Sequence, residues 1–143
     1  IMAGENIDFE IIERDLLEGE FIKDNIKLLK ESGFSISIDD FGTGYSSFET
    51  LCLFPFDYVK IDKSIIDLIH TSNGLAVCRN IAELCVDMGF ICIAEGVETE
   101  EQMKLIRQLN ISYVQGYYFS KAIKADKVMA YINNHRLPES LAA

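Results

Sequence analysis

Short apolar runs alternate along the chain with longer segments in which apolar residues recur every three or four positions. The short runs predict strands, and the longer segments predict helices that turn one apolar face towards a core. The predicted strands are Ile7 to Ile12, Phe34 to Asp39, Tyr58 to Ile61, Phe90 to Ala94 and Ser112 to Gln115. The predicted helices lie near Glu20 to Ser32, Ser46 to Leu53, Leu75 to Met88, Thr99 to Leu109 and Ala125 to Asn134.

This alternation is typical of right-handed βα units around a parallel sheet. Gly33 and Gly89 stand where left-handed helix caps belong, and Thr99 with Gln102 forms a capping box. A closed eight-stranded barrel takes about 250 residues, more than this chain supplies. We therefore expect an α/β fold that is part of a (β/α)8 TIM-type barrel, with about five parallel strands, flanking helices and the amino-terminal strands absent. An open five-stranded sheet with two edges is the alternative.

The composition permits one sizeable core, since the chain has 143 residues of which 49% are hydrophobic. The chain opens without a methionine, almost directly into the first predicted strand, so we expect residues 1–143 to be the carboxyl-terminal portion of a single longer domain. The formal net charge of -10 argues against DNA, RNA and anionic membranes as partners. An acidic protein that handles a phosphate ligand needs metal ions or isolated cations.

The cysteines form neither a CxxC pair nor a zinc-binding spacing. We interpret Cys52, Cys78, Cys85 and Cys92 as reduced core residues and expect a cytoplasmic location. The chain shows no secretory signal, and no uncharged apolar run approaches the roughly 18 to 20 residues of a membrane span. Any membrane anchor of the parent protein would lie in another segment.

Polar residues fall at the carboxyl ends of the predicted strands, where parallel βα folds gather their chemistry. They are Glu10 with Glu13 just beyond it, Asp39 with Asp40, Lys60, Glu95 and Gln115. Alternation along the second strand places Ser35, Ser37 and Asp39 on one face and Phe34, Ile36 and Ile38 on the other, so Asp39 should point into a barrel.

The adjacent carboxylates of Asp39 and Asp40 repel each other unless a cation compensates them, and hard oxygen ligands suit Mg²⁺ or Mn²⁺. Acids, a lysine and a glutamine at one edge suit the attack of a metal-activated water on a phosphodiester. Each residue also has a structural interpretation: a solvated turn for the Asp pair, an exposed edge position for Glu10, a snorkelling side chain for Lys60 and a loop contact for Gln115. Their convergence on strand ends favours the site.

Four linked motifs carry a family resemblance. They are the segments from Asp39 to Ser47, from Phe56 to Asp62, from Ala94 to Thr99 and from Gln115 to Tyr117. In this order they resemble the EAL-domain family of bacterial cyclic-di-GMP phosphodiesterases. The resemblance runs from about Asn6 to Ile123 and covers only the carboxyl-terminal part of that domain. It implies a barrel from its fourth strand onward that hydrolyses cyclic-di-GMP to linear pGpG with Mg²⁺ or Mn²⁺ at a two-metal site.

The resemblance also implies a role for each matching residue. Glu10 and Asp39 resemble direct metal ligands, Asp40 the ligand of a second metal, and Glu95 a further ligand or proton acceptor. Lys60 matches the lysine near the attacking water, and Gln115 matches the residue that orients this water. Glu98 matches a residue that supports the metal ligands without binding the metal itself. Phe41, Gly42, Thr43 and Gly44 match a mobile substrate loop, and Glu13 matches the glutamate that anchors this loop.

The chain departs from the family at several points. The Glu-Ala-Leu signature, the arginine that follows it and a later asparagine ligand are absent, and Ile12 stands in place of the usual threonine. We therefore expect these residues alone to be inactive in hydrolysis. A regulatory module that binds cyclic-di-GMP or a protein partner is the alternative, and upstream sensory or signalling domains are expected in the parent protein.

Two further hypotheses remain open from the residues alone. Lys60 could serve as the Schiff-base lysine of an aldolase-type barrel, although neighbouring acids would raise its pKa where that chemistry needs it lowered. The apolar stretch from Tyr45 to Phe56 could form a homodimer face, although barrel core is the favoured interpretation. Its large apolar residues are Phe48, Leu51, Leu53, Phe54 and Phe56.

Overall fold

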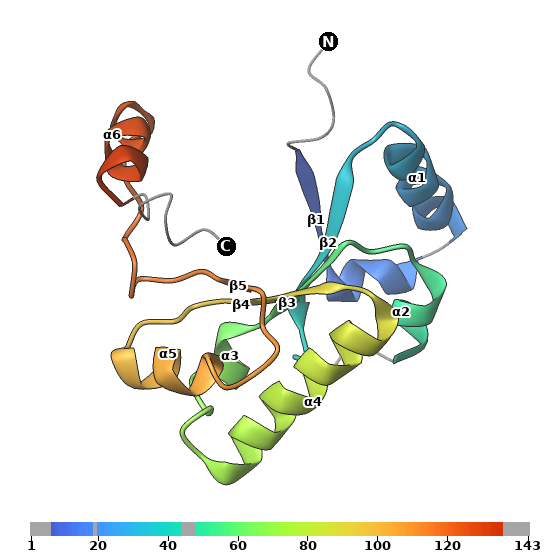
Figure 1. The fold of residues 1–143 in the computed structure, drawn as a ribbon. Helices are drawn as coiled ribbons and strands as arrows, with labels where there is room; N and C mark the ends of the chain where they lie inside the picture. Colours follow the sequence, from blue (N-terminus) through green and yellow to red (C-terminus); the bar gives the residue numbers. More distant parts are fainter. Residues whose placement is uncertain (1–6, 19, 44–47, 136–143) are drawn as a thin grey trace.

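Five parallel strands form one sheet whose spatial order follows the chain, β1-β2-β3-β4-β5 (Figure 1). The computed structural model describes residues 7–18, 20–43 and 48–135. The strands are β1 (Asp8–Ile12), β2 (Ser35–Phe41), β3 (Tyr58–Ile61), β4 (Ile91–Ala94) and β5 (Tyr113–Val114). Between and after them lie the 3-10 helix η2 (Glu13–Glu18) and the helices α1 (Glu20–Glu31), α2 (Phe48–Leu53), α3 (Lys63–Ile66), α4 (Ser72–Met88), α5 (Glu100–Ile106) and α6 (Ala125–His135).

The predicted α/β class, the parallel strands and the flanking helices are confirmed. Two short elements were not predicted: η2 follows β1, and α3 lies between β3 and α4. Helix α4 begins three residues before the predicted Leu75, because Thr71 caps its amino terminus by accepting a hydrogen bond from Gly74 N at 3.0 Å. The predicted residues 46 and 47 lie outside the described residues.

The expected helix caps are present. Gly89 ends α4 at a φ of 77°, and its N–H reaches the carbonyls of Cys85 and Val86. Gly33 turns the chain after α1 at a φ of 84°. Both positions need a left-handed backbone, which glycine adopts without steric cost. Thr99 and Gln102 form both hydrogen bonds of the predicted capping box at the start of α5.

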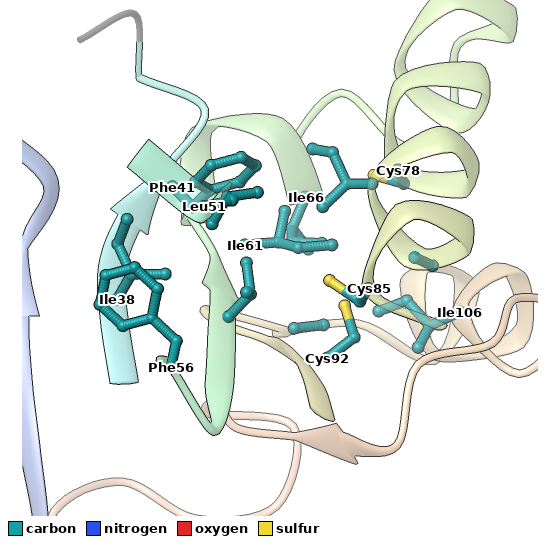
Figure 2. Close-up of a cluster of buried hydrophobic side chains, with 14 of the residues drawn as sticks. Ile38, Phe41, Leu51, Phe56, Ile61, Ile66, Cys78, Cys85, Cys92 and Ile106 are labelled. Carbon is teal, nitrogen blue, oxygen red and sulfur yellow. The ribbon is translucent and has the colours of Figure 1, made fainter. Parts of the chain in front are cut away.

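The hydrophobic core lies between the sheet and its helices, as Figure 2 shows for part of it. Ile38 and Ile61 from the sheet are fully buried, and α4 contributes Cys78 and Cys85 to the same core, with Cys92 of β4 beside Cys85 (Figure 2). These three cysteines are free and buried, as predicted. The prediction for Cys52 was wrong, since this residue is exposed on the outer side of α2 while its neighbour Leu51 turns into the core.

The apolar stretch that could have formed a dimer face contributes mainly to the core. Leu51, Phe54 and Phe56 are buried, whereas Leu53 is exposed. Tyr45 lies outside the described residues, as does the side chain of Phe48. The core interpretation therefore holds for three of the described side chains.

The carboxyl-terminal part of the chain is the most open. Helix α6 has no buried residue and stands away from the sheet in Figure 1, where it follows β5. The strands at the two edges of the sheet are β1 and β5. No helix in the described ranges is both long enough and apolar enough to cross a membrane.

Candidate active site

The ammonium of Lys60 on β3 lies at the centre of three carboxylates. Its Nζ is 2.8 Å from Glu10 Oε1, 3.0 Å from Asp39 Oδ1 and 2.8 Å from Glu95 Oε1. Glu10 comes from β1 and Asp39 from β2, and Glu95 directly follows β4. Because the strands are parallel and paired in register, residues that are distant in the sequence meet at the carboxyl ends of the strands. The structure therefore brings these four predicted site residues together.

Lys60, Asp39 and Glu95 form the buried side of the cluster, and Glu10 lies on the side that is exposed to solvent. The Lys60 side chain is 6% exposed, and those of Asp39 and Glu95 are 22% and 17% exposed, whereas that of Glu10 is 54% exposed. Burial by itself lowers the pKa of Lys60, but its ion pairs with Glu10, Glu95 and Asp39 raise that pKa above its ordinary value. Lys60 therefore stays an ammonium, which argues against the Schiff-base hypothesis because that chemistry needs a neutral amine.

The carboxyl of Glu95 behaves as a partly buried acid. Burial is the largest influence and raises the pKa of Glu95, while the adjacent Lys60 ammonium lowers it and Asp39 raises it further. The balance leaves the pKa of Glu95 above its ordinary value. A carboxylate in this position is a better proton acceptor than one in water.

Asp40 lies beside the cluster in an uncommon backbone conformation. Its φ is 57°, a left-handed value that Asp tolerates better than most residues. Burial raises the pKa of Asp40, and the charges of Asp39 and Asp62 raise it further. Asp62 was not among the predicted site residues, although its place two positions after Lys60, where β3 ends, could have identified it.

The predicted loop is described only in part. Phe41 is 4% exposed and belongs to the core, so it holds the start of the loop from inside. Gly42 follows with a φ of 98°, and Thr43 N–H donates to Asp40 O at 3.3 Å. Gly44 lies outside the described residues, as does the side chain of Glu13.

A hollow of about 480 Å³ adjoins the cluster and joins the last two predicted motifs. Glu95, Glu98 and Gln115 line it, together with Lys63, Gly96, Gly116 and Tyr117. Its volume is within the range of small-molecule sites. Lys63 was missed by the sequence analysis, although it lies three residues after Lys60, and Tyr117 was part of the fourth motif but was given no role.

Close backbone approach holds the two walls of this hollow together. Val97 N–H donates to Gln115 O at 3.1 Å, and Tyr118 N–H donates to Val97 O at 2.9 Å. A Cβ on Gly116 would lie 2.1 Å from Val97 O, so only glycine fits there. Gln115 is therefore fixed beside the segment that carries Glu95.

The donor set suits a hard divalent cation. The candidate ligands are carboxylates, which Mg²⁺ and Mn²⁺ prefer. Asp39 Oδ1 is buried and, although it lies 3.0 Å from Lys60 Nζ, it accepts no well-aligned hydrogen bond from the described residues. In the part of the chain that the structure describes, no three acidic, histidine or cysteine side chains are arranged to hold a metal together. The carboxylates are therefore suitable ligands for a metal, but in this structure they are arranged around the Lys60 ammonium.

The parallel strands and the polar cluster at their carboxyl ends define part of a TIM-type barrel with a candidate active site. The EAL domain family matches residues 1–122, so the chain belongs to that family. The family resemblance inferred from the four motifs is thereby confirmed. One relative is the cyclic di-GMP phosphodiesterase RocR of Pseudomonas aeruginosa, 32% identical over 128 residues that make up 88% of this chain and 33% of that protein.

Solved structures agree in fold. The EAL enzyme Bd1971 in its cAMP- and cyclic-di-GMP-bound form superposes with a TM-score of 0.87 at 34% identity, over 91% of this chain and 35% of that one. BlrP1 of Klebsiella pneumoniae, in a manganese and cyclic-di-GMP complex, gives a TM-score of 0.79 at 30% identity, over 84% of this chain and 31% of that one. The expected partial barrel is therefore confirmed. The chain spans 33% of the length of RocR and 16% of the length of another relative, the protein y4lL of Sinorhizobium fredii.

Proposed function

We propose that this chain forms the carboxyl-terminal part of a metal-dependent phosphodiesterase domain that hydrolyses cyclic-di-GMP to linear pGpG. The observation that carries the proposal is the set of three carboxylates around the Lys60 ammonium at the carboxyl ends of parallel strands. Membership of the EAL family supports it, as do a phosphodiesterase relative and a solved relative bound to manganese and cyclic-di-GMP.

In this proposal Glu10, Asp39 and Glu95 hold Mg²⁺ or Mn²⁺, and Asp40 holds the second ion of a two-metal site. Bound there, such an ion would supply an activated water and neutralise charge on the phosphodiester. Ligands from outside these 143 residues complete the shell, since the Glu-Ala-Leu segment and the asparagine ligand are absent. We therefore propose that this chain alone does not hydrolyse cyclic-di-GMP.

The remaining residues act on the substrate side. The Lys60 ammonium stabilises negative charge that develops on the phosphoryl oxygens, because a buried cation acts strongly where water is excluded. Where Glu95 does not bind the metal, it accepts a proton, a role that its raised pKa favours, and Gln115 in the adjoining hollow orients the water. Glu98 supports the segment that carries Glu95, and the loop from Phe41 to Gly44, anchored by Glu13, covers the substrate. The parent protein acts in the cytoplasm under the control of upstream sensory or signalling domains.

The decisive experiment measures cyclic-di-GMP hydrolysis with Mn²⁺ by this chain and by the same chain extended upstream by roughly 110 residues, enough for a complete barrel. We expect activity only in the extended chain and its loss in Glu95→Ala, with Glu83→Ala on the outside of α4 as the matched control. Hydrolysis that survives Glu95→Ala would contradict the assigned site.

A regulatory module that binds cyclic-di-GMP without hydrolysis is the second candidate. One observation favours it: the carboxylates contact Lys60, and no trio within the described ranges is arranged for a metal. Binding of cyclic-di-GMP by the extended chain, measured by calorimetry, together with no turnover in Mn²⁺ or Mg²⁺, would support this candidate over the enzyme.

A further inference from the structure

Lys63, at the first position of α3, lies across the backbone of the segment that follows β4. Gly96 has a φ of 70°, and a Cβ built there would lie 2.5 Å from Lys63 Cγ and 2.6 Å from Lys63 Cβ. The aliphatic stem of Lys63 therefore occupies the space that any side chain at Gly96 would need. Glu95 is the first residue after β4 and Gly96 is the second, so Lys63 packs against the backbone directly after Glu95.

The ammonium of Lys63 fastens the other end of the same segment. Its Nζ is 2.8 Å from Asp67 Oδ1 on the α3 side and 3.2 Å from Glu98 Oε1. Gln102 extends the network, since its Nε2 donates to Asp67 Oδ1 at 3.5 Å and its Oε1 accepts from Glu98 N at 2.8 Å. Residues 95–98 are thus held between α3 and the amino terminus of α5.

We propose that Lys63 is a positioning residue of the hydrolytic site, which holds residues 95–98 so that the Glu95 carboxylate stays in contact with Lys60. This inference rests on the proposed phosphodiesterase function and adds a residue to it. Lys63 acts through Glu98 and Gly96 and lines the same hollow as Glu95 and Gln115.

A purely structural ion pair makes a different prediction. The side chains of Lys63 and Glu98 are each 44% exposed, and an exposed ion pair contributes little to the stability of a fold. Replacement of Lys63 should therefore leave the melting temperature almost unchanged. If Lys63 positions Glu95, the same replacement should still slow the reaction, because neighbours that orient a ligand are often worth about tenfold or more in activity.

The first arm of the test uses the extended chain. We expect Lys63→Met, which keeps much of the stem but loses the charge, to lower kcat about tenfold. KM for cyclic-di-GMP should change little, while half-maximal activation should need more Mn²⁺. Lys63→Arg should restore most of kcat, and Lys104→Met on α5 serves as the matched control. A wild-type kcat in Lys63→Met, or an equal loss in Lys104→Met, would overturn the proposal.

The second arm needs no activity and uses the 143-residue chain. Glu95 N–H donates to Ile61 O and Val97 N–H donates to Gln115 O, each at 3.1 Å, so both amides should be protected from hydrogen exchange. We expect Lys63→Met to speed exchange at these two amides and Lys104→Met to leave it unchanged. Unchanged exchange in Lys63→Met would refute the positioning role. An inactive wild-type extended chain would instead refute the proposed function, which keeps the two failures distinguishable.

Discussion

At the scale of single residues, the ammonium of Lys60 is shared by the carboxylates of Glu10, Asp39 and Glu95. Glu10, Asp39, Lys60 and Glu95 could be identified because each lies at or near the carboxyl end of a predicted strand. The three ion pairs of Lys60 could not, since they depend on the register of β1, β2, β3 and β4. Lys63 was missed because its role depends on the absent side chain of Gly96, which only the folded chain brings near it.

The Lys60 cluster predicts an unusual response to metal. Lys60→Met removes the ammonium from three carboxylates, two of them mostly buried, and should destabilise the chain by about 3 kcal/mol in metal-free buffer. A divalent cation that takes the vacated position compensates the same charges, so MnCl₂ should raise the melting temperature of the variant more than that of the wild type.

Thermal unfolding followed by circular dichroism, with and without MnCl₂, measures this difference. Lys104→Met is the matched control, since it removes the same positive charge from the exposed side of α5. Equal stability of Lys60→Met and wild type, with no added response to Mn²⁺, would show that the carboxylates do not depend on the ammonium.

At the scale of elements, periodicity and capping signals were sufficient for the main strands and helices. The capping box at Thr99 and the cap at Gly89 were both predicted, because each depends on a few adjacent residues. The short helix α3 was not predicted. It has four residues, too few for a periodic pattern, and its amino terminus is fixed by the side chain of Asp62, which accepts a hydrogen bond from Ser64 N.

Another lysine, Lys30, links two elements at the amino-terminal ends of the strands. Lys30 of α1 places its Nζ 2.6 Å from both carboxylate oxygens of Asp57, whose Oδ2 also accepts from Ile36 N at 2.8 Å. Asp57→Ala leaves that N–H and the Lys30 ammonium without their partner, and we expect a loss of about 2 kcal/mol in the free energy of unfolding. Asp57→Asn should lose less, because its amide oxygen still accepts from Ile36 N.

Urea denaturation of the 143-residue chain measures these losses. Asp87→Ala, an exposed position on α4, is the matched control and should change stability by about 0.5 kcal/mol or less. A second cycle with Lys30→Met should show that the two changes are not additive. Additive losses would mean that Lys30 and Asp57 stabilise the fold independently.

At the scale of the whole molecule, the motifs predicted the family and the partial barrel. Which apolar side chains stay exposed could be seen only in the structure. Between Tyr113 and His135, the last residue that the structure describes, seven large apolar residues are exposed: Tyr113, Tyr117, Phe119, Ile123, Val128, Met129 and Ile132. Apolar periodicity indicates that a helix has an apolar face but not whether another element covers it. In α6 that face has no buried residue, which the pattern alone could not reveal.

This uncovered surface predicts self-association of the 143-residue chain. Parallel sheets are normally covered on both faces, and exposed apolar surface next to an edge strand favours contact between copies. The net charge of -10 opposes that contact, so association should strengthen as salt screens the repulsion. Sedimentation equilibrium at low and high salt should therefore show a mass that rises with protein concentration, and more steeply at high salt.

Substitutions locate the contact. Met129→Lys with Ile132→Lys should weaken association, whereas Val86→Lys, an equally exposed apolar position on α4, should not. Extension of the chain upstream by roughly 110 residues should also weaken association, because a closed barrel has no free edges. A monomeric mass at every concentration and salt level would show that the exposed apolar side chains of β5 and α6 do not cause self-association. Association that persists in the extended chain and disappears in Val86→Lys would instead place the contact on α4 and not on β5 and α6.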